Sequence, residues 1–580
     1  MDHDGIDVVD CDLLIVGSGF AGLWAAISAR SKGVKRIAIA DKGAISLTSQ
    51  SKMAAGATIF CLPQHRPDEW LDDMARANSY LSRQDILSLI LETSYSRLRK
   101  LESWGIEYMR LPGGGYFTLP SRGFERARML VVPKGSGSRG GSAVVRAMLR
   151  QVKAPPDFEH RVDLYPRKMI TGIMVRGGRA VGAVGVDRRT AEPIAFRSRA
   201  VILAGADCSF RGNYLCVDQV TGDAFKLAYD AGVRLNNMEF LVSNTGSPRY
   251  GFEGTGMAAR FARFLDRDLQ PFMKRYHPRA DSAEIRYIVQ AMADQLLQGN
   301  GPPFFFDMSS KPSSYIIHML LDRIGNMVPL NLERLRETGV DVFRGPQEWV
   351  PAVHSLRGGI RTSTDCMSDL PGLFAAGLSQ SVDPGLFNGW SSMRAMWSGE
   401  RSGEAAAGFV LSCDDAGRDP GEEKELARRA LAPLRCRGGS DPDGVCAALQ
   451  RAVFPYGVSV CKDAGSLSGA LREVERLRDE LVPALSAEDP HQLVKAHETA
   501  NMVAVAELYL RVSLIRQESR ADHFRVDFPS TDDESWLAWI NVRREPDGSA
   551  SFEREDVPLD RYPFGPDLKS DRIREVGAAR

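Results

Sequence analysis

Residues 12–33 read DLLIVGSGFAGLWAAISARSKG, and this stretch decides the fold. Its first part, 12–16, is a short apolar run that ends at a glycine, and from residue 22 onward small and apolar residues recur at helical spacing. This pattern predicts a strand, a tight turn and a helix. The next segment, RIAIAD at 36–41, alternates apolar residues up to an acidic one and predicts the second parallel strand of a βαβ unit. The sequence therefore favours an α/β fold.

Three glycines after the first predicted strand form the pattern G-x-G-x-x-G. Gly17 permits the tight turn, Gly19 lets the backbone approach a pyrophosphate, and Gly22 lets helix and strand pack closely. The phosphates then face the positive end of the helix. Asp41, 19 residues after Gly22, would accept hydrogen bonds from a ribose. The alternative is a glycine-rich turn without a ligand, but the strand, the helix and the acid together favour a dinucleotide site, for FAD or for NAD.

The composition disfavours several classes of protein. With 580 residues the chain is several times the usual domain size, so we expect two or three domains. The 74 Lys and Arg balance the 74 Asp and Glu, which disfavours nucleic acid and anionic membranes as main partners. No apolar run approaches the roughly 20 residues of a membrane-spanning helix, and the N-terminus is acidic, so we expect a cytoplasmic protein. The nine cysteines include no CxxC pair, so we expect reduced thiols and no metal site or cluster held by this chain alone.

The character of the sequence changes several times after the first βαβ unit. Short strands with glycine turns occupy about 165–205 and predict an antiparallel layer, whereas heptad-like sequence with charges at about 423–520 predicts a helical bundle. The expected division is a nucleotide-binding domain at 1–235 and 346–415, an inserted α+β domain at 236–345, a helical C-terminal domain at 423–530 and an extended tail at 531–580, whose last 30 or so residues contain three prolines.

Four further segments carry a resemblance to a known family. They are SLTSQSKMAAGAT at 46–58, TGDAFKLAYDAGVRLNNMEF at 221–240, PAVHSLRGGIRTSTD at 351–365 and QESRADHFRVDFP at 517–529. Over about residues 12–540 the chain resembles the flavoprotein subunits of succinate dehydrogenase, fumarate reductase, L-aspartate oxidase and adenylylsulfate reductase. The resemblance implies a Rossmann-like FAD-binding domain, an inserted domain that caps the isoalloxazine, and a helical C-terminal domain.

The resemblance also implies how FAD is held. Covalent members of the family attach FAD through a histidine, and Gln50 stands at the corresponding position here, so we expect non-covalent FAD. The residues expected to contact FAD are Gly17, Gly19, Phe20, Ala21, Gly22, Asp41, Lys42, Ser49, Ser51, Ala55, Gly56, Ala204, Gly205, Asp223, Gly377, Ser391 and Ser392.

The segments that hold dicarboxylates in this family are altered here. The family reads E-F-x-Q-F-H-P-T-G, whereas residues 239–246 read EFLVSNTG, so the first substrate histidine is missing. The family loop E-G-x-R-G-E-G-G is not recognisable in YGFEGTGMAARF at 250–261, and Leu378 replaces the acid that usually follows A-A-G. These departures weigh against succinate, fumarate and aspartate and favour a specialised small anion.

Two substrate-site residues of the family are retained. By resemblance, Arg286 lies beside the flavin as a proton donor or anion clamp, and His354 matches an anion-binding histidine. Arginine is a poor general base because its pKa exceeds about 12, whereas it clamps an anion readily. Without the resemblance, Arg286 would be interpreted as an ordinary surface residue. Ser391 and Ser392 begin the helix predicted at 391–412, where they can cap it and aim its dipole at the flavin.

The sequence leaves three functions open. The first is an FAD-dependent oxidoreductase in which hydride passes between flavin N5 and a small anionic substrate oriented by Arg286 and His354. The second is an adenylylsulfate reductase-like subunit, which resembles this chain at 539–566 and needs an iron–sulfur or other electron-transfer partner. The third is a flavin-bearing structural subunit whose catalytic pocket has decayed.

Overall fold

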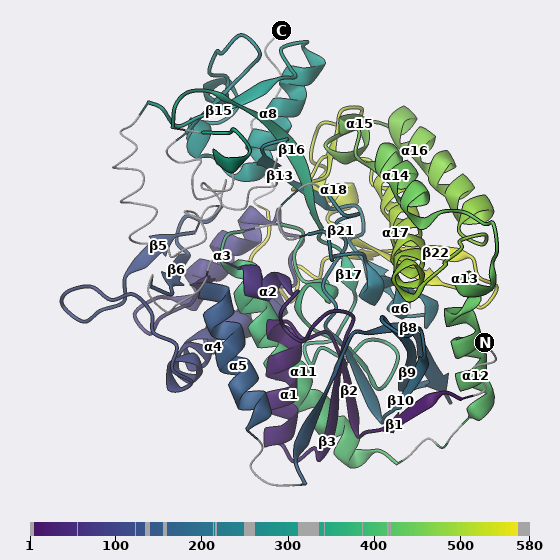
Figure 1. Ribbon diagram of the computed structural model, residues 1–580. Coiled ribbons are helices and arrows are strands. Elements are labelled where there is room, and N and C mark those ends of the chain that lie inside the picture. Colours follow the sequence, from purple (N-terminus) through teal and green to yellow (C-terminus); the bar gives the residue numbers. More distant parts are fainter. Residues whose placement is uncertain are drawn as a thin grey trace.

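A five-stranded parallel sheet lies at the centre of the computed structural model, in the strand order β18-β11-β2-β3-β7 (Figure 1). The structure describes residues 5–54, 56–121, 123–133, 140–154, 159–212, 214, 217–248, 262–310, 336–341, 343–385, 387–414, 417 and 419–566. The strands of this sheet are β2 (Leu13–Val16), β3 (Arg36–Asp41), β7 (Arg161–Pro166), β11 (Ala200–Leu203) and β18 (Leu373–Ala375). The expected α/β class and the parallel pairing of the first two predicted strands are confirmed.

Helices cover one face of this sheet. In β2, Leu13 and Ile15 face α1 and α11, whereas Leu14 faces the opposite layer, as the two-residue period of a strand requires. The two helices lie very close: a Cβ on Gly403 of α11 would stand 2.3 Å from the carbonyl oxygen of Ala25 in α1. The elements on this side are α1 (Phe20–Ser31), α3 (Pro67–Ala77), α4 (Gln84–Ser103), α5 (Gly140–Lys153), α11 (Trp390–Ser412) and the small sheet of β4 (Ala57–Ile59), β5 (Thr118–Pro120) and β6 (Arg128–Val131).

An antiparallel layer covers the other face. Strands β8 and β9 form a hairpin, β10 pairs with β9, and β11 returns to the parallel sheet. The layer expected at about 165–205 is therefore confirmed. Its strands are β1 (Asp7–Asp10), β8 (Lys168–Arg176), β9 (Arg179–Asp187) and β10 (Pro193–Arg197).

The region between β11 and β18 forms a sheet of its own, at the top of Figure 1. Its strand order is β13-β16-β15-β14, and Phe264, Phe306 and Trp349 belong to a separate apolar core. The elements here are β13 (Leu241–Gly246), β14 (Arg263–Leu265), η2 (Met273–Arg275), η3 (Ala280–Ser282), α8 (Ile285–Leu297), β15 (Phe304–Asp307) and β16 (Gln347–Leu356), with α6 (Asp223–Asp230) before them.

Helices dominate the chain after residue 420, at the right of Figure 1. Helices α14, α16 and α17 pack on one another, and their apolar residues join the core beneath the antiparallel layer. The elements are α12 (Pro420–Ala430), α13 (Ala432–Arg435), α14 (Pro442–Val453), α15 (Tyr456–Ser459), β19 (Cys461–Lys462), α16 (Ala464–Arg476), the π-helix η5 (Leu477–Leu481), α17 (Pro490–Ile515) and β20 (Phe524–Arg525).

The segment after residue 530 is folded, and the prediction of an extended tail is wrong for most of its described part. Helix α18 (Asp533–Trp536) is followed by the hairpin of β21 (Ala538–Arg544) and β22 (Ala550–Asp556), which pairs with β12 (Leu235–Asn236). The physical reason is burial, because Trp539, Ile540 and Val542 each have at most 1% of their surface exposed. β12 also pairs with β17 (Gly359–Ile360).

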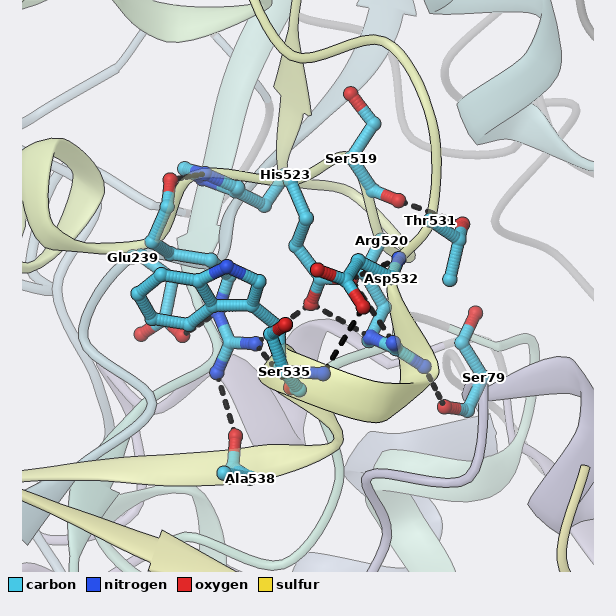
Figure 2. Close-up of polar contacts among 12 residues, drawn as sticks. Ser79, Glu239, Ser519, Arg520, His523, Thr531, Asp532, Ser535 and Ala538 are labelled. Carbon is cyan, nitrogen blue, oxygen red and sulfur yellow. Dashed lines mark hydrogen bonds and ion pairs between the residues drawn. The ribbon is translucent and has the colours of Figure 1, made fainter.

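A network of buried charges ties this C-terminal segment to the start of β13 (Figure 2). Arg516 donates from Nε to Glu239 Oε1 at 2.6 Å and from Nη1 to Glu518 Oε1 at 2.7 Å, and all three side chains are 0% exposed. Arg520 binds the same Glu518 and donates to the carbonyl oxygen of Ser79 at 3.1 Å. Each charge thus has a counter-charge, which burial requires.

Two of the expectations drawn from composition concern the cysteines and membrane-spanning helices. The eight cysteines among the described residues are all free thiols. Within the described part of the chain, no helix is both long enough and apolar enough to cross a membrane.

Candidate functional site

A cleft of about 330 Å³ lies over the carboxyl ends of β2, β3 and β11, where open α/β sheets hold their ligands. Gln50 and Leu378, the two departures from the family pattern, also line it. The predicted FAD contacts found in its lining are Gly17, Gly19, Phe20, Ala21, Asp41, Lys42, Ser49, Ser51, Ala204, Gly205, Asp223, Gly377, Ser391 and Ser392.

The turn between β2 and α1 is too crowded for a side chain at its first two glycines. Gly17 has φ +109°, and a Cβ there would stand 2.4 Å from the carbonyl oxygen of Ala204. On Gly19 a Cβ would stand 3.0 Å from the hydroxyl of Ser51, which instead accepts a hydrogen bond from the Phe20 amide. The bare backbone at the N-terminus of α1 therefore fits a bound pyrophosphate.

Two of the predicted contact residues, Gly22 and Gly56, are not in the lining of the cleft. Gly22 packs beneath the turn, where a Cβ would stand 2.0 Å from the carbonyl oxygen of Gly17. Gly56 has φ +81° and lies against Gly140. Ala55 lies outside the residues that the structure describes.

Asp41 holds the glycine turn as well as lining the cleft. Its Oδ2 accepts hydrogen bonds from the amide and the hydroxyl of Ser18, at 2.9 and 2.5 Å, and its Oδ1 accepts one from the Gly43 amide at 2.7 Å. A carboxylate has about four acceptor positions, so a ribose hydroxyl can still be accommodated.

Lys42 has all three of its protons engaged by the protein. Its Nζ donates to Thr221 at 2.7 Å, to Asp223 on α6 at 2.7 Å and to Glu498 on α17 at 2.8 Å. Burial lowers the pKa of Lys42, but the two carboxylates overcome this effect and raise it. Lys42 therefore joins the cleft to the C-terminal helices, and no proton is left to donate to a ligand.

The N-terminus of α11 reaches the cleft, but not with the capping that the sequence suggests. The N-cap is Gly389, with φ +78° and no side-chain capping bond, so the prediction that Ser391 or Ser392 caps the helix is wrong. Both serines lie in the first turn and line the cleft. The positive end of this 23-residue helix therefore still faces the cleft.

His354 faces the cleft from a β-bulge in β16. Val242 pairs with Ser355 and Ser243 with Val353, so His354 is the extra residue that a bulge re-aims. Burial lowers the pKa of His354 to about 3, with the Arg357 charge adding to the effect. The imidazole is therefore neutral at neutral pH, and its buried Nδ1 has no hydrogen-bond partner among the described residues.

Three residues beside His354 were missed from the sequence. The ring of Tyr214 lies 4.3 Å from that of His354, and its hydroxyl accepts a hydrogen bond from Asn244 at 3.1 Å. Asn244 stands where the family has its missing histidine, which was an available signal; nothing in the sequence marks Tyr214. Arg357, three residues after His354, is 1% exposed, pairs with Asp383 at 3.0 Å and reaches the Ser391 hydroxyl at 3.4 Å.

Arg286 lies outside this cleft, in a compartment of about 20 Å³. Phe387 and Asn388 line both spaces, so the two adjoin. Arg286 pairs with Glu284 (Nε–Oε2 3.1 Å) and donates to the carbonyl oxygen of Ala77 at 2.9 Å. Arg286 and His354 thus line two adjoining spaces, and their joint role in orienting one anion stays a prediction.

Comparisons with known proteins agree with this architecture. The FAD binding domain family matches residues 12–385, and the family described as fumarate reductase flavoprotein C-term matches residues 448–570. A fumarate reductase (CoM/CoB) subunit of Methanothermobacter marburgensis is 28% identical, over 93% of this chain and 98% of that protein. The L-aspartate oxidase of Caulobacter vibrioides is 27% identical, over 90% and 94%.

Solved structures share the fold at lower identity. A mutant of E. coli quinol fumarate reductase superposes with a TM-score of 0.85 at 21% identity, covering 99% of this chain and 100% of that chain. Adenylylsulfate reductase from Archaeoglobus fulgidus superposes with a TM-score of 0.77 at 19% identity, covering 96% and 97%. These matches favour neither the adenylylsulfate reductase-like nor the structural-subunit interpretation.

Proposed function

Because the chain belongs to the FAD-binding family that includes the fumarate reductase flavoproteins, we propose that it holds FAD non-covalently in the cleft and acts on a small anion. The chain is an FAD-dependent oxidoreductase of the fumarate reductase and succinate dehydrogenase flavoprotein superfamily. The observation that carries the proposal is the cleft itself, with a bare glycine turn at one end and Gln50, which has no imidazole, in its wall. We interpret the FAD-binding domain as Rossmann-like, because the glycine turn lies within the parallel βαβ unit of β2, α1 and β3.

The protein's part is to bind and orient. The amides at the N-terminus of α1 would hold the pyrophosphate, and the first turn of α11 would face the ring end of the cofactor. Bound FAD would supply the two-electron chemistry, in which hydride passes to or from the substrate. Arg357 places a buried positive charge beside that turn, where negative charge on the cofactor or substrate is stabilised.

The substrate would lie beside His354, Asn244 and Tyr214. A neutral histidine and an amide donate hydrogen bonds to an anion without adding charge, while Arg357 supplies the positive field. This set differs from the family's dicarboxylate pattern, so we propose a small anion other than succinate, fumarate or aspartate. Since the relative from M. marburgensis is named as one subunit of its enzyme, we also propose an electron-transfer partner, such as an iron–sulfur protein.

The first test is the visible spectrum of the purified protein before and after acid precipitation. We expect a flavin spectrum and FAD in the supernatant. Colour that stays in the pellet would overturn the non-covalent linkage, and a colourless protein that fails to bind added FAD would overturn the proposed function.

Two variants then test the substrate side. His354→Gln and Arg357→Met should reduce turnover at least about tenfold while the ratio of FAD to protein stays at the wild-type value. His491→Gln, at an exposed histidine, is the matched control and should change neither quantity. Equal turnover in all of these proteins would show that the substrate does not bind at the His354 end of the cleft.

A further inference from the structure

A cluster of buried charges lies behind the part of the cleft wall that includes Arg357. The side chains of Arg357 and of Arg394 on α11 are each 1% exposed, and both pair with Asp383, which is 0% exposed. The distances to its two carboxylate oxygens are 3.0 Å from Arg357 and 3.3 Å from Arg394. One carboxylate thus serves two guanidinium groups, which leaves one positive charge in excess in a buried place.

Asp207, four residues after the end of β11, is the further acid on which both arginine charges act. It is 1% exposed, and its Oδ2 accepts a hydrogen bond from the hydroxyl of Ser355. Its Oδ1 is buried and has no hydrogen-bond partner among the described residues. This second oxygen can therefore take up a proton without breaking a hydrogen bond. The ionised carboxylate cancels the excess positive charge of the cluster, and the protonated one leaves it.

The contacts of Asp207 place it directly behind the cleft wall. Its chain neighbour Ala206 and its hydrogen-bond partner Ser355 both line the cleft, whereas Asp207 itself does not. The Leu356 amide also donates to the carbonyl oxygen of Cys208 at 2.8 Å, so the two segments are joined by backbone as well. Asp207 therefore has a defined position near the cleft but acts on its contents through charge rather than through contact.

Asp207 changes its charge near neutral pH. Burial raises the pKa of Asp207 to about 6, against the Ser355 hydrogen bond and the two arginine charges. Burial also raises the pKa of the Cys208 thiol, lowers the pKa of His354 to about 3 and lowers the pKa of Arg394 to about 10. Between about pH 5 and pH 8 these three neighbours keep one charge state, while Asp207 passes from neutral to ionised.

We propose that Asp207 sets the charge behind the ring end of the cleft and thereby controls how readily bound FAD is reduced. This inference rests on the proposed function. Reduction adds two electrons, and the excess positive charge of the cluster stabilises the added negative charge. Reduction is therefore more favourable when Asp207 is protonated. By linkage, Asp207 takes up as much as one proton from solvent when the electron donor delivers the electron pair, and it returns this proton to solvent on reoxidation.

A carboxylate can act in this way without touching the cofactor, because charges interact over several ångströms in a protein interior. With an effective dielectric constant of about 20, a unit charge about 10 Å away changes an equilibrium constant by about tenfold. Salt screens a buried group such as Asp207 only weakly. Asp207 is therefore a positioning residue for charge, and the decisive readout is a reduction potential measured against pH.

The first experiment titrates FAD-loaded wild type and Asp207→Asn with dithionite against a reference dye, from about pH 5 to pH 8. At about pH 8 the equilibrium constant for reduction should be about tenfold higher in Asp207→Asn, which is about 30 mV for a two-electron couple. At about pH 5 the two proteins should agree, because Asp207 is then protonated in wild type. Asp7→Asn, at an exposed acid of β1, is the control and should follow wild type throughout. A shift of equal size at both pH values, or no shift at pH 8, would overturn the proposal.

A second variant keeps the aspartate and removes its hydrogen bond. Because the Ser355 hydroxyl favours the ionised carboxylate, Ser355→Ala should raise the pKa of Asp207. The pH at which the potential of the bound flavin changes slope should therefore move upward. Ser412→Ala, at an exposed serine of α11, is the matched control and should leave that pH unchanged. A change of slope at the wild-type pH in Ser355→Ala would count against Asp207 as its origin, even if Asp207→Asn does not fold.

The third experiment needs neither electrons nor cofactor. Infrared difference spectra between about pH 5 and pH 8 are recorded for wild type, Asp207→Asn and Asp7→Asn. Wild type minus Asp207→Asn should show one carboxylic-acid C=O band, and wild type minus Asp7→Asn should show none. Absence of the first band would overturn the proposal. A purified protein that binds no FAD would count against the proposed function, and the infrared band then decides whether Asp207 carries the proton.

Discussion

The glycine turn and the Arg286 compartment serve adjoining spaces but are built in opposite ways. The turn comes from one continuous stretch, in which Gly17 and Gly19 expose backbone and Asp41 holds the loop. The compartment is assembled from residues that lie as far apart in sequence as Gly123 and Asp522. A site made of local backbone can be recognised from its motif, whereas a site made of distant side chains depends on every contact that brings them together.

The largest effect is expected from a substitution in the glycine turn, the site that is built from local backbone. Gly17→Val forces a side chain into the carbonyl oxygen of Ala204 and into a backbone with φ +109°. We expect the FAD content to fall at least about 100-fold, measured as the flavin-to-protein absorbance ratio. Gly33→Ala shares a positive φ, +96°, but meets no atom within 4 Å. It should keep its FAD and lose about 1 kcal/mol of stability, and equal FAD loss in both variants would refute the clash as the cause.

The next largest effect is expected in the buried charge network, where residues distant in sequence hold one another. Arg516→Met leaves Glu239 buried without its counter-charge and leaves Glu518 with Arg520 alone, which should cost about 3–5 kcal/mol in urea unfolding. The matched control is Arg428→Met at an exposed pair with Glu425, where no measurable change is expected. A loss below about 1 kcal/mol at Arg516 would show that the network does not hold the C-terminal segment in place.

A third prediction uses pH to examine the wall of the cleft. Because the folded pKa of His354, about 3, lies below its unfolded value of 6.5, its contribution to stability is present above about pH 6.5 and is lost as pH falls. At about pH 5 wild type should lose on the order of 2 kcal/mol relative to His354→Gln, which cannot take up the proton. The measurement is the difference in Tm between the two proteins at about pH 7 and pH 5. If the difference in Tm does not change with pH, His354 is more exposed to solvent than the structure indicates.

The smallest effects come from two glycines of α11. Gly408 is exposed, with nothing within 4 Å of an added Cβ, so Gly408→Ala should stabilise the protein by about 0.5–1 kcal/mol. Gly403→Ala should instead destabilise it by about 1–3 kcal/mol, because the Cβ would meet the Ala25 carbonyl oxygen of α1 at 2.3 Å. Thermal unfolding of the two variants checks the signs. Equal shifts would mean that α1 and α11 can move apart without cost.

The difference between local and distant contacts also explains which parts of the fold could be predicted from the sequence. The strands at 12–16 and 36–41 were predictable because their patterns are local, and so was the antiparallel layer at about 165–205. The hairpin β21–β22 was missed because prolines near it were given more weight than the alternation around Trp539.

Within the site, the outcome depended on whether a residue acts through its own segment. Gly17 and its neighbours in the turn were found from their spacing. Ser391 and Ser392 were correctly placed at the start of α11, but the prediction that they cap it was wrong, because Gly389, with a positive φ, is the N-cap. Tyr214 and Asp522 could not be predicted, since only the folded chain brings Tyr214 to His354 and Asp522 to Arg286.

The contacts of Lys42 determine when the rim of the cleft can be completed during synthesis on the ribosome. Its ammonium is shared between Asp223 and Glu498, which are separated by more than 270 residues of sequence. A nascent chain that has emerged only as far as α11 already contains the whole glycine turn, yet it lacks one of the two carboxylates that balance this cation. The rim of the cleft is therefore completed late in translation, when α17 has emerged and can dock.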